Sequence, residues 1–451
     1  MELKKEESVD LRFSSGATAI LSLVVPGARG SLNMEQIETR ERLSVGNYEL
    51  KMSEIDGVFH QIQRIALYLF FFSINFEVWD PLNTGGYFSL SKLTGLIYFA
   101  TIIPRFKIFT AIGTINYYML PLWLLFGLLT IVSWFNINSI SSNFFHFSIF
   151  QNIILFLILL LHAREEPSVL EKGMLCFAFG SICLTLLYMA GIGTEYTEGR
   201  VSLFGDNENV IGLRMCISMT ILLLAIFQNS LSLNKIRYLF IIPVPLMLHL
   251  MFQTGSRVAT IAFFMAFVVG TILFKTKKIW TKIAVLVGGG IALFAGWLYM
   301  LQSESLIQRF MRTTEEGDLA GRDVIWRELM ALVGNDLIFG VGLTGYTYFS
   351  HTIFGRFKSP HNVFIEILCY TGIVGLTIYL IFLFRIFKSG YQSYRSDGFL
   401  LPLVLLIPVA GLLLSGQILY TKIGWIIFAY VASSSMSKQK NNCGYNKYSM
   451  L

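Results

Sequence analysis

Two arginines and one histidine are the residues of this chain best suited to chemistry. Arg257 lies in a short turn between two apolar stretches, where a charged side chain is costly. Arg322 begins a predicted helix that ends near Gly334, and the first turn of a helix offers free backbone N–H groups to an anion. A guanidinium group pairs two phosphate oxygens at once. Both arginines therefore predict contact with a phosphate-bearing ligand, most naturally a diphosphate.

His361 follows Lys358-Ser-Pro at the start of another apolar stretch. Histidine is the side chain best suited to accept a proton near neutral pH, so His361 is the candidate general base, with His351 as a second candidate. Asn362 and Glu366 lie just inside the same stretch. Glu366 is an intramembrane carboxylate, and we expect it to pair with an arginine.

The next five charged residues are not expected to take part in chemistry. Asp206 and Glu208 are of metal-ligand type, but the rest of a ligand set is missing, so no metal site is predicted. Three further arginines are expected at lipid headgroups: Arg309, Arg312 and Arg327.

A glycine pattern of the form G-x-G-x-x-G runs from Gly340 through Gly342 to Gly345. A dinucleotide site would need a strand before this pattern and a βαβ unit around it, and neither is predicted here. We expect these glycines to let the backbone approach the membrane domain or a glycan closely.

The composition then defines the class of protein that must position these residues. Of the 451 residues, 54% are hydrophobic and only 14% are charged, whereas soluble domains carry about 25% charged residues. This excludes a cytosolic enzyme, a secreted scaffold and a disordered chain. The net charge of +7 does not indicate nucleic-acid binding, because the basic residues form no single patch.

Apolar runs of about 20 residues predict an all-α polytopic membrane protein, since only helices fit segments of this kind. About twelve transmembrane helices are predicted, near 60–78, 87–104, 115–134, 145–163, 171–192, 209–228, 235–253, 257–274, 280–301, 361–387, 399–415 and 418–434. One long extracytoplasmic loop containing short helices, 302–360, precedes the tenth span.

Lysines and arginines alternate between connections and predict the orientation. Residues such as Arg105, Lys277 and Lys388 fall in every second connection, which places both termini in the cytoplasm. The predicted organisation is a polar cytoplasmic extension at 1–56, a transmembrane domain at 57–434 and a cytoplasmic tail at 435–451. No secretory signal is predicted, and Met34 would begin an equally sensible N-terminus, so residues 1–33 need not be native.

These residues occur in an order that resembles the O-antigen ligase and polymerase superfamily. The matching motifs are Gly255-Ser256-Arg257, Gly321-Arg322 before Trp326, Gly340-Val-Gly342, Pro360-His361-Asn362 and Gly372-Ile-Val-Gly375. The resemblance is strongest over 250–390. An earlier segment from Arg200 to Gly212 is similar, although Glu208 stands before Asn209 where the family often has proline.

The resemblance implies metal-independent glycosyl transfer, without a cofactor, at the outer face of the bacterial inner membrane. The donor would be an oligosaccharide on undecaprenyl diphosphate. Arg257 and Arg322 would hold the diphosphate, with Arg200 as a third contact, and His361 would activate the acceptor hydroxyl. Further substrate contacts are expected from Asn209, Arg356, Lys358, Asn362 and Glu366.

Our functional hypothesis is a polymerase of O-antigen, capsule or exopolysaccharide that joins lipid-linked repeat units. A ligase that transfers the glycan to lipid A-core in lipopolysaccharide biosynthesis and a protein O-oligosaccharyltransferase are alternatives within the superfamily. A flippase for the same lipid-linked glycan is the alternative from a different class. Expected partners are the acceptor glycan or lipid A-core, membrane lipids and a chain-length regulator. The sequence does not predict the sugar, the linkage or the oligomeric state.

Overall fold

The computed structural model describes residues 11–12, 18–19, 57–84, 88–102, 115–135, 143–197, 199–228, 234–275, 279–315 and 321–448. By its internal contacts the chain divides into a unit at 1–60 and a unit at 61–451. In the first unit, β1 (Leu11–Arg12) pairs antiparallel with β2 (Thr18–Ala19). The second unit contains every predicted site residue and is described below.

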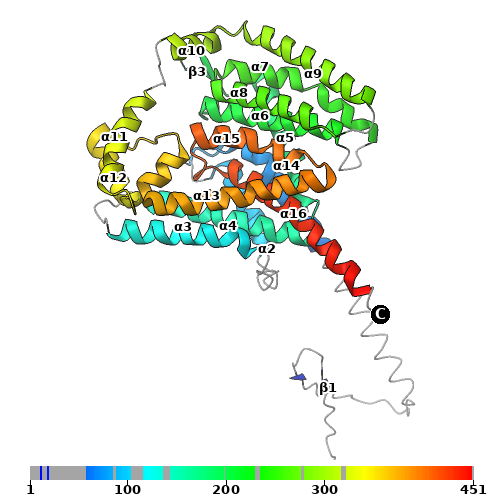
Figure 1. Ribbon diagram of the computed structural model, residues 1–451, viewed down its shortest axis with the longest axis horizontal. Coiled ribbons are helices and arrows are strands. Elements are labelled where there is room, and N and C mark those ends of the chain that lie inside the picture. Colours follow the sequence, from blue (N-terminus) through cyan, green and yellow to red (C-terminus); the bar gives the residue numbers. More distant parts are fainter. Residues whose placement is uncertain are drawn as a thin grey trace, which may run out of the picture. The chain divides into compact units, whose positions relative to one another are not determined.

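The second unit is built from helices connected mostly by short loops (Figure 1). A helix over 57–73 runs into η1 (Ile74–Phe76). The helices that follow are α2 (Leu90–Ile102), α3 (Asn116–Phe135), α4 (Asn143–Glu165), α5 (Val169–Met189), α6 (Glu208–Phe227), η4 (Asn234–Ile241), α7 (Val244–Gln253), α8 (Arg257–Leu273), α9 (Ile279–Met300), α10 (Glu304–Glu315), α11 (Arg322–Asn335), α12 (Gly342–Phe354), α13 (Val363–Asp397), α14 (Leu401–Val404), α15 (Leu406–Ser415) and α16 (Lys422–Tyr448).

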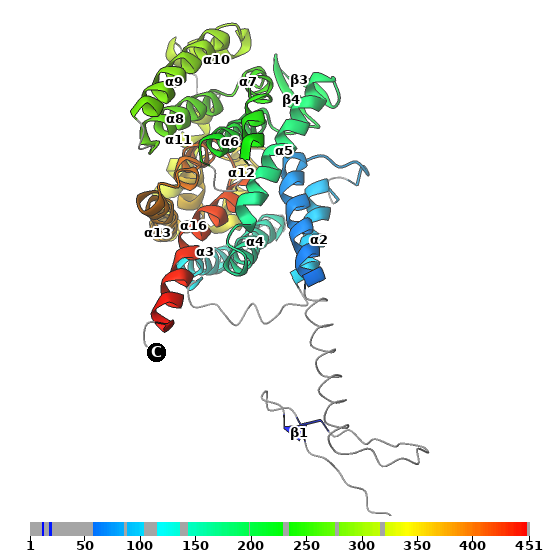
Figure 2. The ribbon, with the colours of Figure 1, turned by 90° about the vertical axis from the view of Figure 1, so that its right-hand side faces the viewer.

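Two groups of packed helices carry the core. In one group, α13 packs against α3 and α16, and α16 packs against α4 (Figure 1). In the other group, α6 packs against α5, α7, α8 and α15, and its residues 211–220 are all buried. Figure 2 shows the helix over 57–73 beside α2, where Phe70 stacks on Tyr98. A helix that is apolar all round, as α6 nearly is, belongs in the interior of a bundle.

Six helical segments are long and apolar enough to cross a membrane: Asn116–Phe135, His146–Glu165, Val169–Met189, Glu208–Phe227, Lys235–Gln253 and Val363–Asp397. Four shorter apolar segments are Leu90–Ile102, Arg257–Leu273, Val287–Met300 and Leu401–Ser415. These ten segments coincide with predicted spans, and the helical, membrane-type fold is confirmed. The number twelve is not confirmed.

Three boundaries differ from the prediction. Helix α13 continues through Lys388 and Arg395 to Asp397, and Gly398, with φ of 70°, supplies the left-handed cap that ends it. The helix α16 extends to Tyr448, into the predicted tail. The polar segment after α5 forms a hairpin of β3 (Thr194–Thr197) and β4 (Arg200–Leu203), which the all-helical prediction did not include.

Helix α13 is broken at Gly372, whose φ of 61° and ψ of −163° are not helical. The chain that precedes α12 docks against this break. The Val341 N–H donates to the Cys369 carbonyl at 2.9 Å, and the Ile373 N–H donates to the Leu337 carbonyl at 2.9 Å. The docked chain therefore satisfies backbone groups that the break would otherwise leave without partners.

Glycines make this docking geometrically possible. A Cβ on Gly340 would lie 2.6 Å from the Cys369 carbonyl oxygen, and one on Gly342 would lie 2.6 Å from the Ser133 Cα of α3. Both glycines also have a positive φ of 70°. The close approach to the membrane domain expected from the glycine pattern is confirmed.

Gly340→Ala should lower the thermal unfolding temperature of the purified protein in detergent. Alanine at positive φ costs about 1 kcal/mol, and here its Cβ would also collide with the backbone of α13. Gly355→Ala is the matched control, because Gly355 has a φ of 69° and no atom within 4 Å of an added Cβ. Equal unfolding temperatures for the two variants would contradict the docking of this segment against α13.

Candidate active site

Three helices begin with residues that the sequence analysis selected. Arg257 is the first residue of α8, after Ser256, whose hydroxyl accepts the Ala259 N–H. Arg322 is the first residue of α11. His361 lies just before α13. The N-terminus of a helix carries free N–H groups and the positive end of the helix dipole, so each of these positions favours an anion.

Arg257 and Arg309 are joined by a hydrogen bond beside the turn that follows α7. The Arg257 Nη1 donates to the Arg309 carbonyl at 2.9 Å, and the Arg309 Nη1 donates to the Gly255 carbonyl at 3.1 Å. An added Cβ on Gly255 would lie 3.3 Å from the Arg200 Cγ. Arg200 and Arg309, from separate parts of the chain, therefore pack against Gly255, which lies two residues before Arg257. Arg309 was expected at lipid headgroups, and the structure places it in this cluster instead.

Arg322 completes what we call the arginine cluster, which comprises Arg200, Arg257, Arg309 and Arg322. Burial lowers the pKa of Arg322, and the positive charges of Arg257 and Arg309 lower it further. The Arg322 guanidinium is therefore close enough to those of Arg257 and Arg309 to be repelled by them. A bound anion among them would relieve this repulsion.

Arg200 is tied to the start of α6. Its Nε donates to the Thr254 carbonyl at 2.9 Å, and its Nη2 donates to the Asn209 Oδ1 at 3.1 Å. Its Nη1 lies 3.2 Å from the Glu208 carboxylate. Glu208 therefore offsets the charge of Arg200, and Asn209 fixes its guanidinium plane. Neither contact was predicted.

Within the α11–α13 region, His361 adopts a left-handed conformation with φ of 49°, and its N–H donates to the Ser359 Oγ at 3.1 Å. Backbone strain of this kind is concentrated at functional sites. Burial lowers the pKa of the His361 imidazole, and the charges of Arg322 and Lys358 lower it further. The ring is therefore neutral at pH 7 and able to accept a proton, and it lies within electrostatic reach of the arginine cluster.

Hydrogen bonds to α11 and α13 fix the turn that carries His361. The Trp326 Nε1 donates to the Pro360 carbonyl at 2.8 Å, and Trp326 lies one helical turn after Arg322. The Ser359 hydroxyl donates to the Glu366 Oε1 at 2.7 Å. Helix α11 therefore presents Arg322 and anchors the histidine turn at the same time.

Glu366 is fully buried and does not have the arginine partner that was expected. Within the described part of the chain, Ser359 is its hydrogen-bond partner, and its Oε2 accepts no hydrogen bond. The prediction of an arginine pair is therefore wrong. The geometry makes Glu366 an anchor for that turn.

The remaining candidates have clear local contacts. Asn362 caps α13, since its Oδ1 accepts the Phe364 and Ile365 N–H groups at 3.0 and 3.3 Å. The Lys358 N–H donates to the Ser350 Oγ at 2.7 Å. Arg356 is exposed, and no contact among the described residues joins its guanidinium to the arginine cluster. The structure thus brings Lys358 and Asn362 to the site, but not Arg356.

A buried charge network supports the cluster and was missed by the sequence analysis. Arg214 of α6 is 1% exposed and contacts the Asp206 carboxylate, while its Nη2 lies 3.6 Å from Glu77. The Lys422 Nζ lies 2.7 Å from the same Glu77. Arginine in the middle of an apolar span was a visible signal of such a network. Because Asp206 lies just before Glu208 and Asn209, the network fixes the segment that holds Arg200.

Asp206 and Glu208 thus face arginines. Among the residues that the structure describes, no three His, Cys, Asp or Glu side chains form a group that could hold a metal ion. Gly321 occupies the cap position of α11 with φ of 71°.

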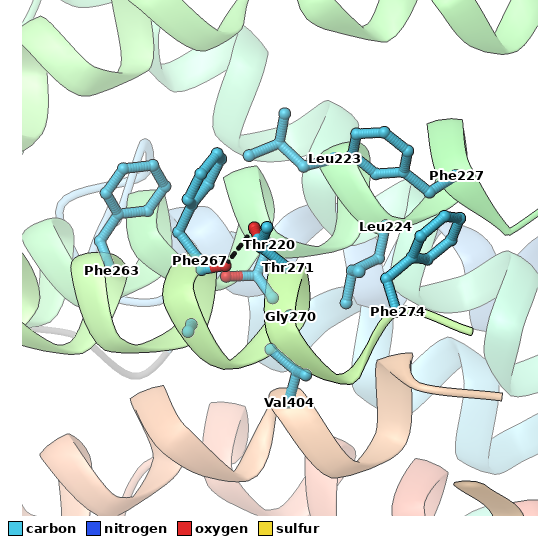
Figure 3. A pocket seen from close by; sticks show the side chains of 11 residues that line it. Thr220, Leu223, Leu224, Phe227, Phe263, Phe267, Gly270, Thr271, Phe274 and Val404 are labelled. Atoms are coloured by element: carbon cyan, nitrogen blue, oxygen red, sulfur yellow. Dashed lines mark hydrogen bonds between the residues drawn. The ribbon is translucent and has the colours of Figure 1, made fainter. Parts of the chain in front are cut away.

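A pocket between α6, α8 and α14 is distinct from this site (Figure 3). Its volume is about 30 Å³, close to that of one water molecule. The side chains around it are mainly apolar and include Leu223, Phe227, Phe263, Phe267 and Phe274. This pocket is too small for a glycan.

Comparison with known proteins bears on the same region. Residues 242–380 match a family described as O-antigen ligase. The matched segment contains Arg257, Arg309, Arg322 and His361, whereas Arg200 lies outside it. No curated protein matches the chain. The match covers about a third of the chain and supports the resemblance to the superfamily of O-antigen ligases and polymerases.

Proposed function

We propose that this membrane enzyme is a polymerase that joins undecaprenyl-diphosphate-linked repeat units of a surface polysaccharide at the outer face of the bacterial inner membrane. The observation that carries this proposal is that the arginine cluster and a neutral histidine lie near one another, at the starts of three helices. Fixed positive charge suits a diphosphate leaving group, and a neutral imidazole suits removal of a hydroxyl proton.

The proposed reaction is a direct displacement. The acceptor hydroxyl oxygen forms a bond to the anomeric carbon of the donor sugar, while the bond from that carbon to the phosphate oxygen breaks. Undecaprenyl diphosphate leaves with the bonding electron pair. Arg257 and Arg322, with Arg309 beside them, stabilise the negative charge that develops on the leaving oxygen. No nucleotide is required, because the sugar phosphate bond already supplies the energy.

His361 receives the proton of the acceptor hydroxyl in this scheme. Burial and the charges of Arg322 and Lys358 favour the neutral imidazole before the reaction, because a further positive charge in this buried place is unfavourable. After proton transfer the imidazolium adds to the positive charge that faces the departing diphosphate. Glu366 and Asn362 act by holding the histidine turn and the start of α13, and Asn209 holds Arg200.

A ligase acting on lipid A-core and a protein oligosaccharyltransferase would use the same donor chemistry. They differ from a polymerase in the acceptor. The purified enzyme, given only the lipid-linked repeat unit, should extend it into a ladder of longer lipid-linked products. A ladder supports the polymerase. Transfer that occurs only when lipid A-core or an acceptor protein is added would contradict it.

Arg257→Ala and Arg322→Ala should each reduce turnover roughly ten- to hundredfold. Loss of one charge-assisted hydrogen bond costs about 1.5–3 kcal/mol. Lysine at either position should restore activity only in part, since it keeps the charge but loses the two-pronged geometry. Turnover is measured with purified protein and lipid-linked donor.

Arg327→Ala is the matched control for these variants, because Arg327 is exposed on α11 and no contact joins it to the cluster within the described chain. It should keep wild-type activity. Wild-type turnover in Arg322→Ala would remove Arg322 from the mechanism.

His361→Gln should reduce turnover roughly 10²- to 10⁴-fold while donor affinity is kept, because the diphosphate contacts remain. His351→Ala, a change at an exposed histidine of α12, should be mild by comparison. Loss of donor affinity as severe as the loss of turnover would make His361 a binding residue instead of a base.

The pH dependence follows from the same histidine. A base works when it is deprotonated, and the pKa of His361 is lowered, so turnover should fall only below about pH 6.5, the ordinary value for histidine. Lys358→Met removes a positive charge near the ring and should move this fall to higher pH. An unchanged profile in Lys358→Met would contradict the role of the imidazole.

The proposed orientation places both chain termini in the cytoplasm and the starts of α8, α11 and α13 outside. Reporter fusions after Arg164 and Arg395 should report the cytoplasm, and fusions after Gly193 and Glu315 the outside. A cytoplasmic signal at Glu315 would place the arginine cluster on the wrong side of the membrane for a donor presented at the outer face.

A further inference from the structure

A polar hollow adjoins the arginine cluster. Its volume is about 730 Å³, within the range of small-molecule sites. Three glutamines and three arginines line it: Gln253, Gln302, Gln308, Arg200, Arg309 and Arg312. They come from the ends of α7 and α9, the start of β4 and the length of α10. None of the three glutamines was selected from the sequence.

Helix α10 forms a fixed polar wall of this hollow. Glu304, Gln308 and Arg312 are spaced four residues apart and so share one face of the helix. Leu306, on another face, is fully buried. The Ser303 hydroxyl, just before α10, donates to the Phe252 carbonyl at 3.3 Å and fastens the helix to the end of α7.

The polar wall is also ordered within itself, because the Gln308 Nε2 donates to the Glu304 Oε1 at 3.0 Å. This hydrogen bond orients the amide plane of Gln308, which lines the hollow. A side chain that is already oriented loses less conformational entropy when it binds a ligand.

The hollow and the arginine cluster share two residues. Arg200 and Arg309 line the hollow, and both lie against Gly255 beside Arg257. A donor whose diphosphate lies on Arg257 and Arg322 would therefore have its next chemical group at the mouth of the hollow. For a lipid-linked glycan, the group on one side of the diphosphate is the prenyl chain, and the group on the other side is a sugar.

The lining distinguishes these two groups. A prenyl chain needs apolar walls, and this hollow is lined mainly by amides and guanidinium groups. A glutamine amide both donates and accepts hydrogen bonds, which matches sugar hydroxyls that do the same. We propose that the hollow is the glycan subsite of the donor, in which Gln302 and Gln308 contact the sugar residues next to the diphosphate. This inference rests on the proposed function.

The test compares two probes on purified protein in lipid nanodiscs. One probe is undecaprenyl diphosphate without a sugar, and the other is the undecaprenyl-diphosphate-linked repeat unit purified from the source cells. Gln302→Ala combined with Gln308→Ala should weaken binding of the glycan-bearing probe about tenfold, the effect of losing one or two neutral hydrogen bonds. Binding of the sugar-free probe should be unchanged.

Control variants separate this inference from the proposed function. Gln392→Ala, at an exposed glutamine of α13 far from the hollow in sequence, should bind both probes as the wild type does. Arg322→Ala should weaken both probes alike. If Arg322→Ala leaves both affinities unchanged, the proposed function fails, whatever the glutamine variants do.

Two outcomes would overturn the glycan subsite itself. Wild-type affinity of the double glutamine variant for the glycan-bearing probe would show that the hollow does not hold sugar. Equal weakening of both probes would show that the hollow holds the diphosphate. Gln302 and Gln308 are both exposed, so the double variant should unfold at the wild-type temperature, and this is checked on the same preparation.

Discussion

Electrostatic repulsion among arginines is the constraint on which the account of this molecule depends. The guanidinium groups of Arg257, Arg309 and Arg322 are close enough that two of them lower the pKa of the third. Two of these arginines also begin helices, where the backbone dipole is positive. A protein that gathers positive charge in this way gains stability when an anion binds, and a departing diphosphate is an anion whose charge grows during the reaction.

The rest of the fold can be understood as the framework that keeps these charges in place. Buried Arg214 and Asp206 fasten the start of α6, which in turn holds Arg200. The chain before α12 docks against the break in α13, and Trp326 fastens α11 to the turn of His361. The last two contacts join segments that are distant in the sequence, so the site depends on tertiary packing more than on any single motif.

That dependence explains what could be predicted from the sequence. Apolar runs predicted most helices, and a helix from Arg322 to near Gly334 was predicted at α11, because these signals are local. The break at Gly372 and the role of Arg309 were not predicted, since each depends on a partner far along the chain. Arg309 contacts Arg257 across 52 residues, and no local pattern records such a contact.

The central claim is that the starts of α8 and α11 together bind a diphosphate. A cryo-electron microscopy structure of the protein with undecaprenyl diphosphate, in lipid nanodiscs, tests it most directly. The account predicts density for the two phosphates within about 3 Å of the Arg257 and Arg322 guanidinium groups, the distance of a charge-assisted hydrogen bond. A diphosphate bound elsewhere, with both guanidinium groups beyond hydrogen-bond distance, would contradict it.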